Sequence, residues 1–132
     1  MTAYSFKPRF VEPILTLRKH QTIRAPRLGR SRHVRPGEQI QLYAGMRTKQ
    51  CRLIGVATCT AVTPITLDFI NHSFAIGAGQ WTTYARRNEF ARRDGFDTWQ
   101  EMEHFWQVEH DGMKMFTGVL IEWDPQSLRS RA

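Results

Sequence analysis

RKHQTIRAPRLGRSRHVRPG, residues 18–37, combines two features that rarely occur in one segment. It contains seven Lys or Arg and no acidic residue, yet it also holds the fragment QTIR, residues 21–24. A disordered basic tail would not need that fragment, and an ordinary loop would not need so much positive charge. We therefore interpret residues 22–24 as a short strand, followed by a long basic loop over residues 26–37.

The length and composition of the chain predict one domain spanning residues 1–132. A chain of 132 residues is close to the commonest domain size, and 41% hydrophobic residues can supply a core. The sequence has no apolar run of eighteen residues and no apolar signal-peptide core near its N-terminus. We expect a cytoplasmic protein that does not enter membranes.

The two cysteines, Cys51 and Cys59, lie in one run of β-branched residues, CRLIGVATCTAV, which is typical of a strand. Eight residues of strand would separate them by roughly 26 Å, too far for a disulfide. We expect both to be reduced and packed in the core. The sequence has no CxxC or HxxxH pair, so we predict no structural zinc site and no metal held by the protein.

The positive charge is concentrated near the N-terminus. The net charge is +7 with a pI near 10.1. Residues 1–37 hold nine cations against one acid, Glu12; the cations are Lys7, Arg9, Arg18, Lys19, Arg24, Arg27, Arg30, Arg32 and Arg35. Concentrated positive charge favours a polyanion, most simply nucleic acid, whose phosphates release counterions on binding. The alternative is a solvated face on a basic protein.

Hydrophobic periodicity predicts one short helix and three strands in the first half of the chain. Apolar residues near helical spacing indicate a short helix within residues 7–19. Residues 38–45 alternate apolar and polar side chains, as in a half-buried strand. A longer strand follows from residue 51 to about residue 62. We expect Pro64 to interrupt it, with another strand over residues 65–70.

The second half reads mainly as helix. Residues 82–96 have helical spacing, with Gly95 as a C-terminal stop. Residues 97–110 form a second helix, with Asp97 as the expected N-cap, and residues 114–124 form a closing strand. We assign five aromatic residues to the core: Trp99, Phe105, Trp106, Phe116 and Trp123. The pattern predicts an α+β protein, a small β-barrel flanked by two to four helices.

Four segments together resemble ASCH domains, which belong to the PUA-like superfamily. They are ILTLRKHQTIR, RPGEQIQLYAGMRTKQCRLIG, FARRDGFDTWQEM and GVLIEW, in family order across roughly residues 5–123. The resemblance implies a PUA-like barrel with helices packed beside it and a basic cleft between them. It also implies RNA or modified nucleosides as ligands. Relatives include RNA-binding modules, proteins that cut single-stranded RNA with a divalent metal, and small enzymes that deacetylate N-acetylcytidine.

The resemblance also implies catalytic residues. In the deacetylating relatives a Lys, a Thr three residues later and a downstream Glu form the site, and these match Lys19, Thr22 and Asp94. Here the acid is Asp, which is one methylene shorter than Glu. A Thr hydroxyl needs an adjacent base, and a lysine amine can serve if neighbouring cations lower its pKa. The alternative is that Lys19 binds phosphate, Thr22 packs in the barrel and Asp94 ends a helix.

A second group of residues points to nucleic acid. Tyr43 can stack on a base, while Arg47 and Lys49 on the following turn can reach phosphate. The alternative is a solvated hairpin tip. The predicted nucleic-acid contacts are completed by arginines beside the first basic strand and on the opposite wall: Arg18, Arg24, Arg27 and Arg86.

The sequence leaves the reaction open. No pair of acids at short spacing marks a two-metal site, so any Mg²⁺ would be held mainly by the nucleic acid itself. Three functions follow from these observations: an RNA-binding ribonuclease, an N-acetylcytidine amidohydrolase, and a non-catalytic reader of RNA or modified bases. The expected partner is single-stranded RNA or a modified nucleoside.

Overall fold

The computed structural model of the chain describes residues 2–29, 31–79, 81–82 and 84–130. Arg30 and the ends of the predicted 1–132 domain lie outside the described residues. Within these ranges the elements are β1 (Thr2–Phe6), η1 (Pro8–Phe10), α1 (Val11–Leu15), β2 (Gln21–Arg24), β3 (Gln39–Ala44), β4 (Arg52–Asp68), β5 (Ser73–Ile76), η2 (Tyr84–Arg86), α2 (Arg87–Arg93), α3 (Trp99–Glu109), β6 (Met115–Trp123), η3 (Pro125–Ser127) and β7 (Arg129–Ser130), where η marks a 3₁₀ helix.

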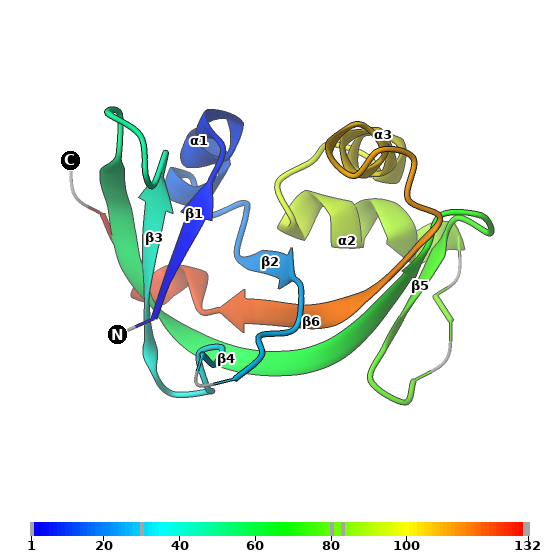
Figure 1. Cartoon of the computed structure of the whole chain (residues 1–132), viewed down its shortest axis with the longest axis horizontal. Coiled ribbons are helices and arrows are strands. Elements are labelled where there is room, and N and C mark those ends of the chain that lie inside the picture. Colours follow the sequence, from blue (N-terminus) through cyan, green and yellow to red (C-terminus); the bar gives the residue numbers. More distant parts are fainter. Residues whose placement is uncertain (1, 30, 80, 83, 131–132) are drawn as a thin grey trace.

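One long strand organises the sheet. β4 pairs with β3 along its first part and with β6 along its second part, giving the order β1-β3-β4-β6-β2. β5 and β7 also pair with β4. The β1–β3 ladder is parallel, whereas the other ladders are antiparallel. Figure 1 shows β4 and β6 as a curved floor, with α1 and β1 above one end and α2 and α3 above the other.

The predicted α+β class is confirmed, but the predicted closed barrel is not. The described residues form no ladder between β1 and β2, so the sheet is open between these strands. The Arg24 side chain lies in this gap, where its Nη2 donates to the Ser5 carbonyl oxygen at 2.7 Å. A side chain thus satisfies a backbone acceptor that a neighbouring strand would otherwise use.

The helices follow the predicted spacing, with two differences. The helix predicted at residues 82–96 is divided into η2 and α2, and it ends before Gly95, as expected. The N-cap of α3 is Thr98, which corrects the assignment to Asp97. The Thr98 hydroxyl accepts a hydrogen bond from the Glu101 backbone N–H at 3.1 Å. Within the described ranges, every helix is too short or too polar to cross a membrane.

The expected break at Pro64 is wrong, because β4 continues to Asp68. The Pro64 carbonyl accepts a hydrogen bond from Gly77 at 2.7 Å, so this edge of Pro64 faces the end of β5. A residue's N–H and C=O point to the same side of an antiparallel strand. The ladder with β5 ends at the pair of Ile65 and Ile76. The missing N–H of Pro64 therefore costs the sheet no ladder hydrogen bond on this side.

Other differences concern short or exposed elements. β1, β5 and β7 were not anticipated, because each spans five residues or fewer. Cys59 is buried as expected, whereas Cys51 is exposed just before β4 begins, which corrects its assignment to the core. Both thiols are free.

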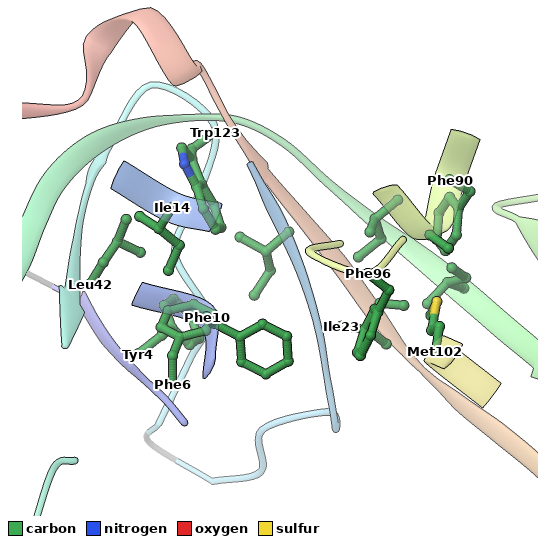
Figure 2. Close-up of a cluster of buried hydrophobic side chains, with 14 of the residues drawn as sticks. Tyr4, Phe6, Phe10, Ile14, Ile23, Leu42, Phe90, Phe96, Met102 and Trp123 are labelled. Carbon is green, nitrogen blue, oxygen red and sulfur yellow. The ribbon is translucent and has the colours of Figure 1, made fainter. Parts of the chain in front are cut away.

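The core has two parts that meet over the sheet. Figure 2 shows one group of side chains around Ile14 and Trp123 and another around Phe90 and Met102, and all four are nearly fully buried. Three of the five aromatic residues assigned to the core, Trp99, Trp106 and Trp123, are buried. The other two, Phe105 and Phe116, are only partly buried. The reason is a pocket that opens between the two parts.

Candidate active site

A pocket of about 310 Å³ lies between the β1–β2 side of the molecule and α3. Its walls are mainly aromatic, and they come from elements far apart in the sequence. Polar residues also line the pocket, among them Lys19, Thr22, Arg24 and Asp94. A concave, largely apolar cavity with a few convergent polar groups is the usual form of a small-molecule site.

Lys19 is placed by the end of α1. Its backbone N–H donates to the Pro13 carbonyl at 2.9 Å, and the next residue, His20, donates to the Arg93 carbonyl at 3.0 Å. The first bond ties Lys19 back to α1, and the second joins this loop to the end of α2. The Lys19 side chain is only 2% exposed, and its Nζ lies 4.6 Å from the centroid of the Phe10 ring. An ammonium in this position has lost nearly all of its hydration.

The close approach of Lys19 to α2 depends on Gly95. This residue has φ +98°, a left-handed conformation that glycine adopts without steric cost. A Cβ at this position would lie 2.9 Å from Cδ of Lys19 and 3.0 Å from Cδ1 of Phe10. The helix stop predicted from the sequence is therefore also the gap through which Lys19 reaches Asp94.

Lys19 and Asp94 form a buried pair. The Lys19 Nζ donates to the Asp94 backbone oxygen at 2.5 Å and lies 3.9 Å from Oδ1 of its carboxyl group. The same Oδ1 accepts from Nε2 of Gln21 at 3.3 Å. Burial lowers the pKa of Lys19 to about 8 despite the opposing pull of Asp94, and burial raises the pKa of Asp94. Desolvation thus outweighs mutual attraction for both groups.

Thr22 and Arg24 share one face of β2, as the period-two pattern predicted. The Arg24 Nε donates to the Thr22 hydroxyl oxygen at 3.0 Å. Thr22 is 6% exposed and lines the pocket. The Arg24 guanidinium lies 4.9 Å from the centroid of the Phe6 ring and 5.3 Å from that of Tyr4. The hydroxyl therefore faces a fixed, charged donor.

A hydrogen-bond chain holds the basic loop against β1. Tyr4 lies below Arg24, and its hydroxyl is 2.8 Å from Nδ1 of His33. The other ring nitrogen of His33 is 2.7 Å from the Ala25 carbonyl, and Val34 N–H donates to the Tyr4 oxygen at 3.2 Å. Burial lowers the pKa of His33, in keeping with a neutral ring that donates to Ala25 and accepts from Tyr4. This loop has a structural role in closing the fold around Arg24.

Part of the concentrated positive charge is paired with acids, four of them from other parts of the fold. Of the eight N-terminal cations that the structure describes, five make ion pairs: Lys7 with Glu109, Arg9 with Glu101, Arg18 with Asp97, Lys19 with Asp94 and Arg32 with Glu38. Three of these acids belong to α3 or its N-terminal approach. Part of the charge asymmetry of the sequence therefore reflects attraction between the N-terminal part of the fold and α3.

The predicted nucleic-acid residues do not gather at the pocket. Tyr43 lies in β3 between the buried Leu42 and Ala44, so it faces the other side of the strand and is half-buried. Arg47 and Lys49 are exposed on the turn after β3. The exposed Arg86 belongs to η2 and the exposed Arg27 to the basic loop; like Arg18, neither lines the pocket. Of the predicted contacts, only Arg24 does.

Sequence reasoning missed most of the pocket wall. Phe105 and Trp106 both line it, together with Glu109 and His110 at the end of α3 and Phe116 on β6. One signal was available, because consecutive helical residues point about 100° apart and cannot both face the same core. The described residues contain no group of three or more His, Cys, Asp or Glu arranged to hold a metal ion.

Comparisons with known proteins agree on the fold. No family model and no curated protein matches the chain. Among solved structures, a mutant form of ZmASCH from Zymomonas mobilis matches with a TM-score of 0.54 and 15% identity, covering 96% of this chain and 68% of that chain. The DUF984 protein EF3133 from Enterococcus faecalis matches with a TM-score of 0.54 and 16% identity, covering 94% of this chain and 74% of that chain. The fold is that of ASCH domain proteins, and the resemblance found in the sequence is confirmed at that level.

Proposed function

We propose that the protein is an amidohydrolase that removes an acyl group from a modified nucleoside, with N-acetylcytidine as the first candidate substrate. One observation carries the proposal: Lys19, Thr22 and Asp94 line a single aromatic pocket, although the last lies more than seventy residues further along the chain. They are the residues that match the Lys, Thr and acid of the deacetylating relatives.

The pocket suits one planar base. Its volume, about 310 Å³, is at the small end of the range for ligand sites. Its aromatic walls can stack on a flat ring, as Phe and Trp do with nucleobases. A pocket of this size favours a single base with its acyl group over a longer stretch of polymer.

The chemistry follows from the protonation states. Above its pKa of about 8, Lys19 is a neutral amine and can accept the Thr22 hydroxyl proton as the threonine oxygen attacks the acyl carbon. The carbon–nitrogen bond then breaks, and the proton on Lys19 passes to the departing amino group of the base. Water hydrolyses the resulting acyl ester of Thr22 and regenerates the hydroxyl. Asp94 holds the lysine amine in place throughout.

The pairing of charges also favours a small substrate. Cations near the pocket already have partners in α3 or just before it, so a polyanion would have to displace several acids to reach them. A neutral nucleoside would displace none. Exposed ion pairs contribute only about 0–1 kcal/mol each, so this is a preference and not a barrier.

Single-stranded RNA is the second candidate ligand. Its support is a set of exposed cations for which the described residues provide no ion-pair partner, including Arg27, Arg47, Lys49 and Arg86. RNA bound along them would present a base to the pocket, either for cleavage or for reading alone. Any Mg²⁺ required for cleavage would be held mainly by the RNA.

The test is product analysis with both ligand classes. The protein is incubated with N-acetylcytidine, with its 5′-monophosphate, and with labelled single-stranded RNA, each with and without magnesium. Release of cytidine and acetate without magnesium supports the amidohydrolase. RNA fragments that appear only with magnesium favour the ribonuclease instead. Salt-sensitive RNA binding without any product supports a non-catalytic protein that reads RNA or modified bases.

A further inference from the structure

The mouth of the pocket carries an ion pair that joins its two walls. Lys7 follows β1 and Glu109 is the last residue of α3, and these two elements stand above opposite ends of the sheet (Figure 1). Nζ of Lys7 lies 3.0 Å from Oε2 of Glu109. Both residues line the pocket and are exposed, as is His110, whereas Lys19 and Thr22 are buried. The pocket therefore runs from a buried reactive end to a charged mouth.

The stability of α3 does not explain Glu109. The C-terminal end of a helix carries partial negative charge, so cations are favoured there and carboxylates are not. The ion pair with Lys7 is exposed to water, and exposed pairs contribute little to stability. Within the described part of the chain Lys7 contacts Oε2, and no hydrogen bond reaches Oε1. One carboxylate oxygen is therefore left at the mouth for a ligand.

The shape of the proposed substrate places its sugar at this mouth, so the inference rests on the proposed function. In N-acetylcytidine the acylated amino group and the ribose are attached at opposite positions of the six-membered ring. When the acyl carbon lies at Thr22, the ribose points away from the buried end of the pocket. Its hydroxyls can donate hydrogen bonds, and an ionised carboxylate can only accept them.

We propose that Glu109 is a specificity residue that accepts hydrogen bonds from the 2′- and 3′-hydroxyls of the ribose, so that the protein selects ribonucleosides over deoxyribonucleosides and free bases. Lys7 holds the carboxylate in position from the opposite wall. The His110 ring stacks on Trp106 with the ring centroids 4.5 Å apart, which extends the aromatic wall to the level of the sugar. A 5′-phosphate gains nothing from Glu109, because like charges repel.

The experiment measures sugar preference separately from catalysis. Binding of cytidine, 2′-deoxycytidine and cytosine, which carry no acyl group to cleave, is measured by isothermal titration calorimetry. The kcat/KM values for N-acetylcytidine and its 2′-deoxy form are compared in parallel. The variants are Glu109→Gln and Lys7→Gln. Glu12→Gln is the matched control, because Glu12 is an exposed helical carboxylate that does not line the pocket. Melting temperatures are recorded for all variants.

We expect the parent to bind cytidine about 10–100-fold more tightly than 2′-deoxycytidine, the scale of one hydrogen bond to a charged group, and to show the same ratio in kcat/KM. Glu109→Gln should reduce the ratio to about 3-fold, because a neutral amide oxygen accepts more weakly. Its affinity for 2′-deoxycytidine should not change. Lys7→Gln should reduce the ratio in part, and Glu12→Gln should leave it at the parental value.

Equal binding of the two nucleosides by the parent overturns the inference, and this comparison needs no variant. A parental ratio in a folded Glu109→Gln protein also overturns it, and a lower melting temperature there would give the ion pair a structural role only. If the ribose preference depends on Glu109 but N-acetylcytidine is not cleaved, the inference stands and the proposed reaction falls. Cleavage of both sugar forms at equal rates supports the reaction and removes the inference. Failure of every ligand to bind removes both.

Discussion

The pocket and the hairpin tip after β3 contain the same kinds of side chain in opposite surroundings. Both contain a lysine, an arginine and an aromatic ring. In the pocket, Lys19 is buried against rings and its pKa falls to about 8. On the tip, Arg47 and Lys49 are exposed to water. The sequence predicted a function for each region, catalysis for Lys19 and its partners and nucleic-acid contacts for the tip.

Their difference shows what desolvation adds. A solvated lysine is a full charge that salt screens, so it can attract phosphate but cannot act as a base near neutral pH. A desolvated lysine titrates close to neutrality and can exchange protons with a neighbour. Chemistry is therefore expected in the pocket, and only electrostatic attraction at the tip.

The largest effect should come from Thr22→Val, which removes the hydroxyl while nearly keeping the shape of the side chain. Losing a nucleophile typically costs about 10⁴-fold or more in turnover. N-acetylcytidine cleavage should therefore disappear, while the melting temperature changes little. If a folded Thr22→Val protein retains parental turnover, Thr22 is not the nucleophile.

Lys19→Arg should have the next largest effect, because a guanidinium stays protonated and cannot accept the Thr22 proton. Removing a general base typically costs about 10²–10⁴-fold. In the parent, turnover should rise as pH increases through about 8, the pKa at which Lys19 becomes neutral. If the parental turnover does not change with pH in this range, Lys19 is not the general base.

Gly95→Ala should have an intermediate effect, since it acts only through the position of Lys19. A Cβ there would press on Cδ of Lys19, and alanine would hold a left-handed conformation at a cost of about 1–2 kcal/mol. We expect a lower melting temperature and reduced turnover. Gly112→Ala is the control, because its φ is also positive but nothing lies within 4 Å of its Cβ position. Equal losses of turnover in both would show that Gly95 acts through backbone strain alone.

Asp94→Glu should have a small effect in the opposite direction. The Asp94 carboxyl oxygen is 3.9 Å from Lys19 Nζ, and one more methylene would let it come closer. Turnover should equal or exceed that of the parent. Asp94→Asn, which has the same size without the charge, should be slower than both, and the opposite order would contradict a role for the carboxylate.

The smallest effect on nucleoside turnover should come from the tip. Tyr43→Ala and Lys49→Ala should leave N-acetylcytidine cleavage unchanged, because neither residue lines the pocket. If RNA binds the tip, Lys49→Ala should weaken all sequences similarly and make the salt dependence shallower by about 0.7 per phosphate lost. Tyr43→Ala should weaken binding by about 1–3 kcal/mol if a base stacks there. RNA affinity unchanged in both variants would make the tip part of the scaffold only.

Local pattern was sufficient for much of the fold. The alternation over residues 38–45 predicted β3, and helical spacing with Gly95 as a stop predicted α2, because such periodicity reflects which side of an element is buried. Pro64 misled this reasoning, since its effect depends on whether a strand lies beside its missing N–H. β5 ends opposite Ile65, one residue short of Pro64, and this register is known only from the sheet.

By itself, the sequence supplied three candidate residues: Lys19, Thr22 and Asp94 match the Lys, Thr and acid that the family resemblance implies. Only the tertiary structure decided which of them lie together and in what surroundings. The pKa of Lys19 and the pairing of the N-terminal cations with α3 depend on desolvation and distance. Both quantities are properties of elements distant in sequence, and no local pattern contains them.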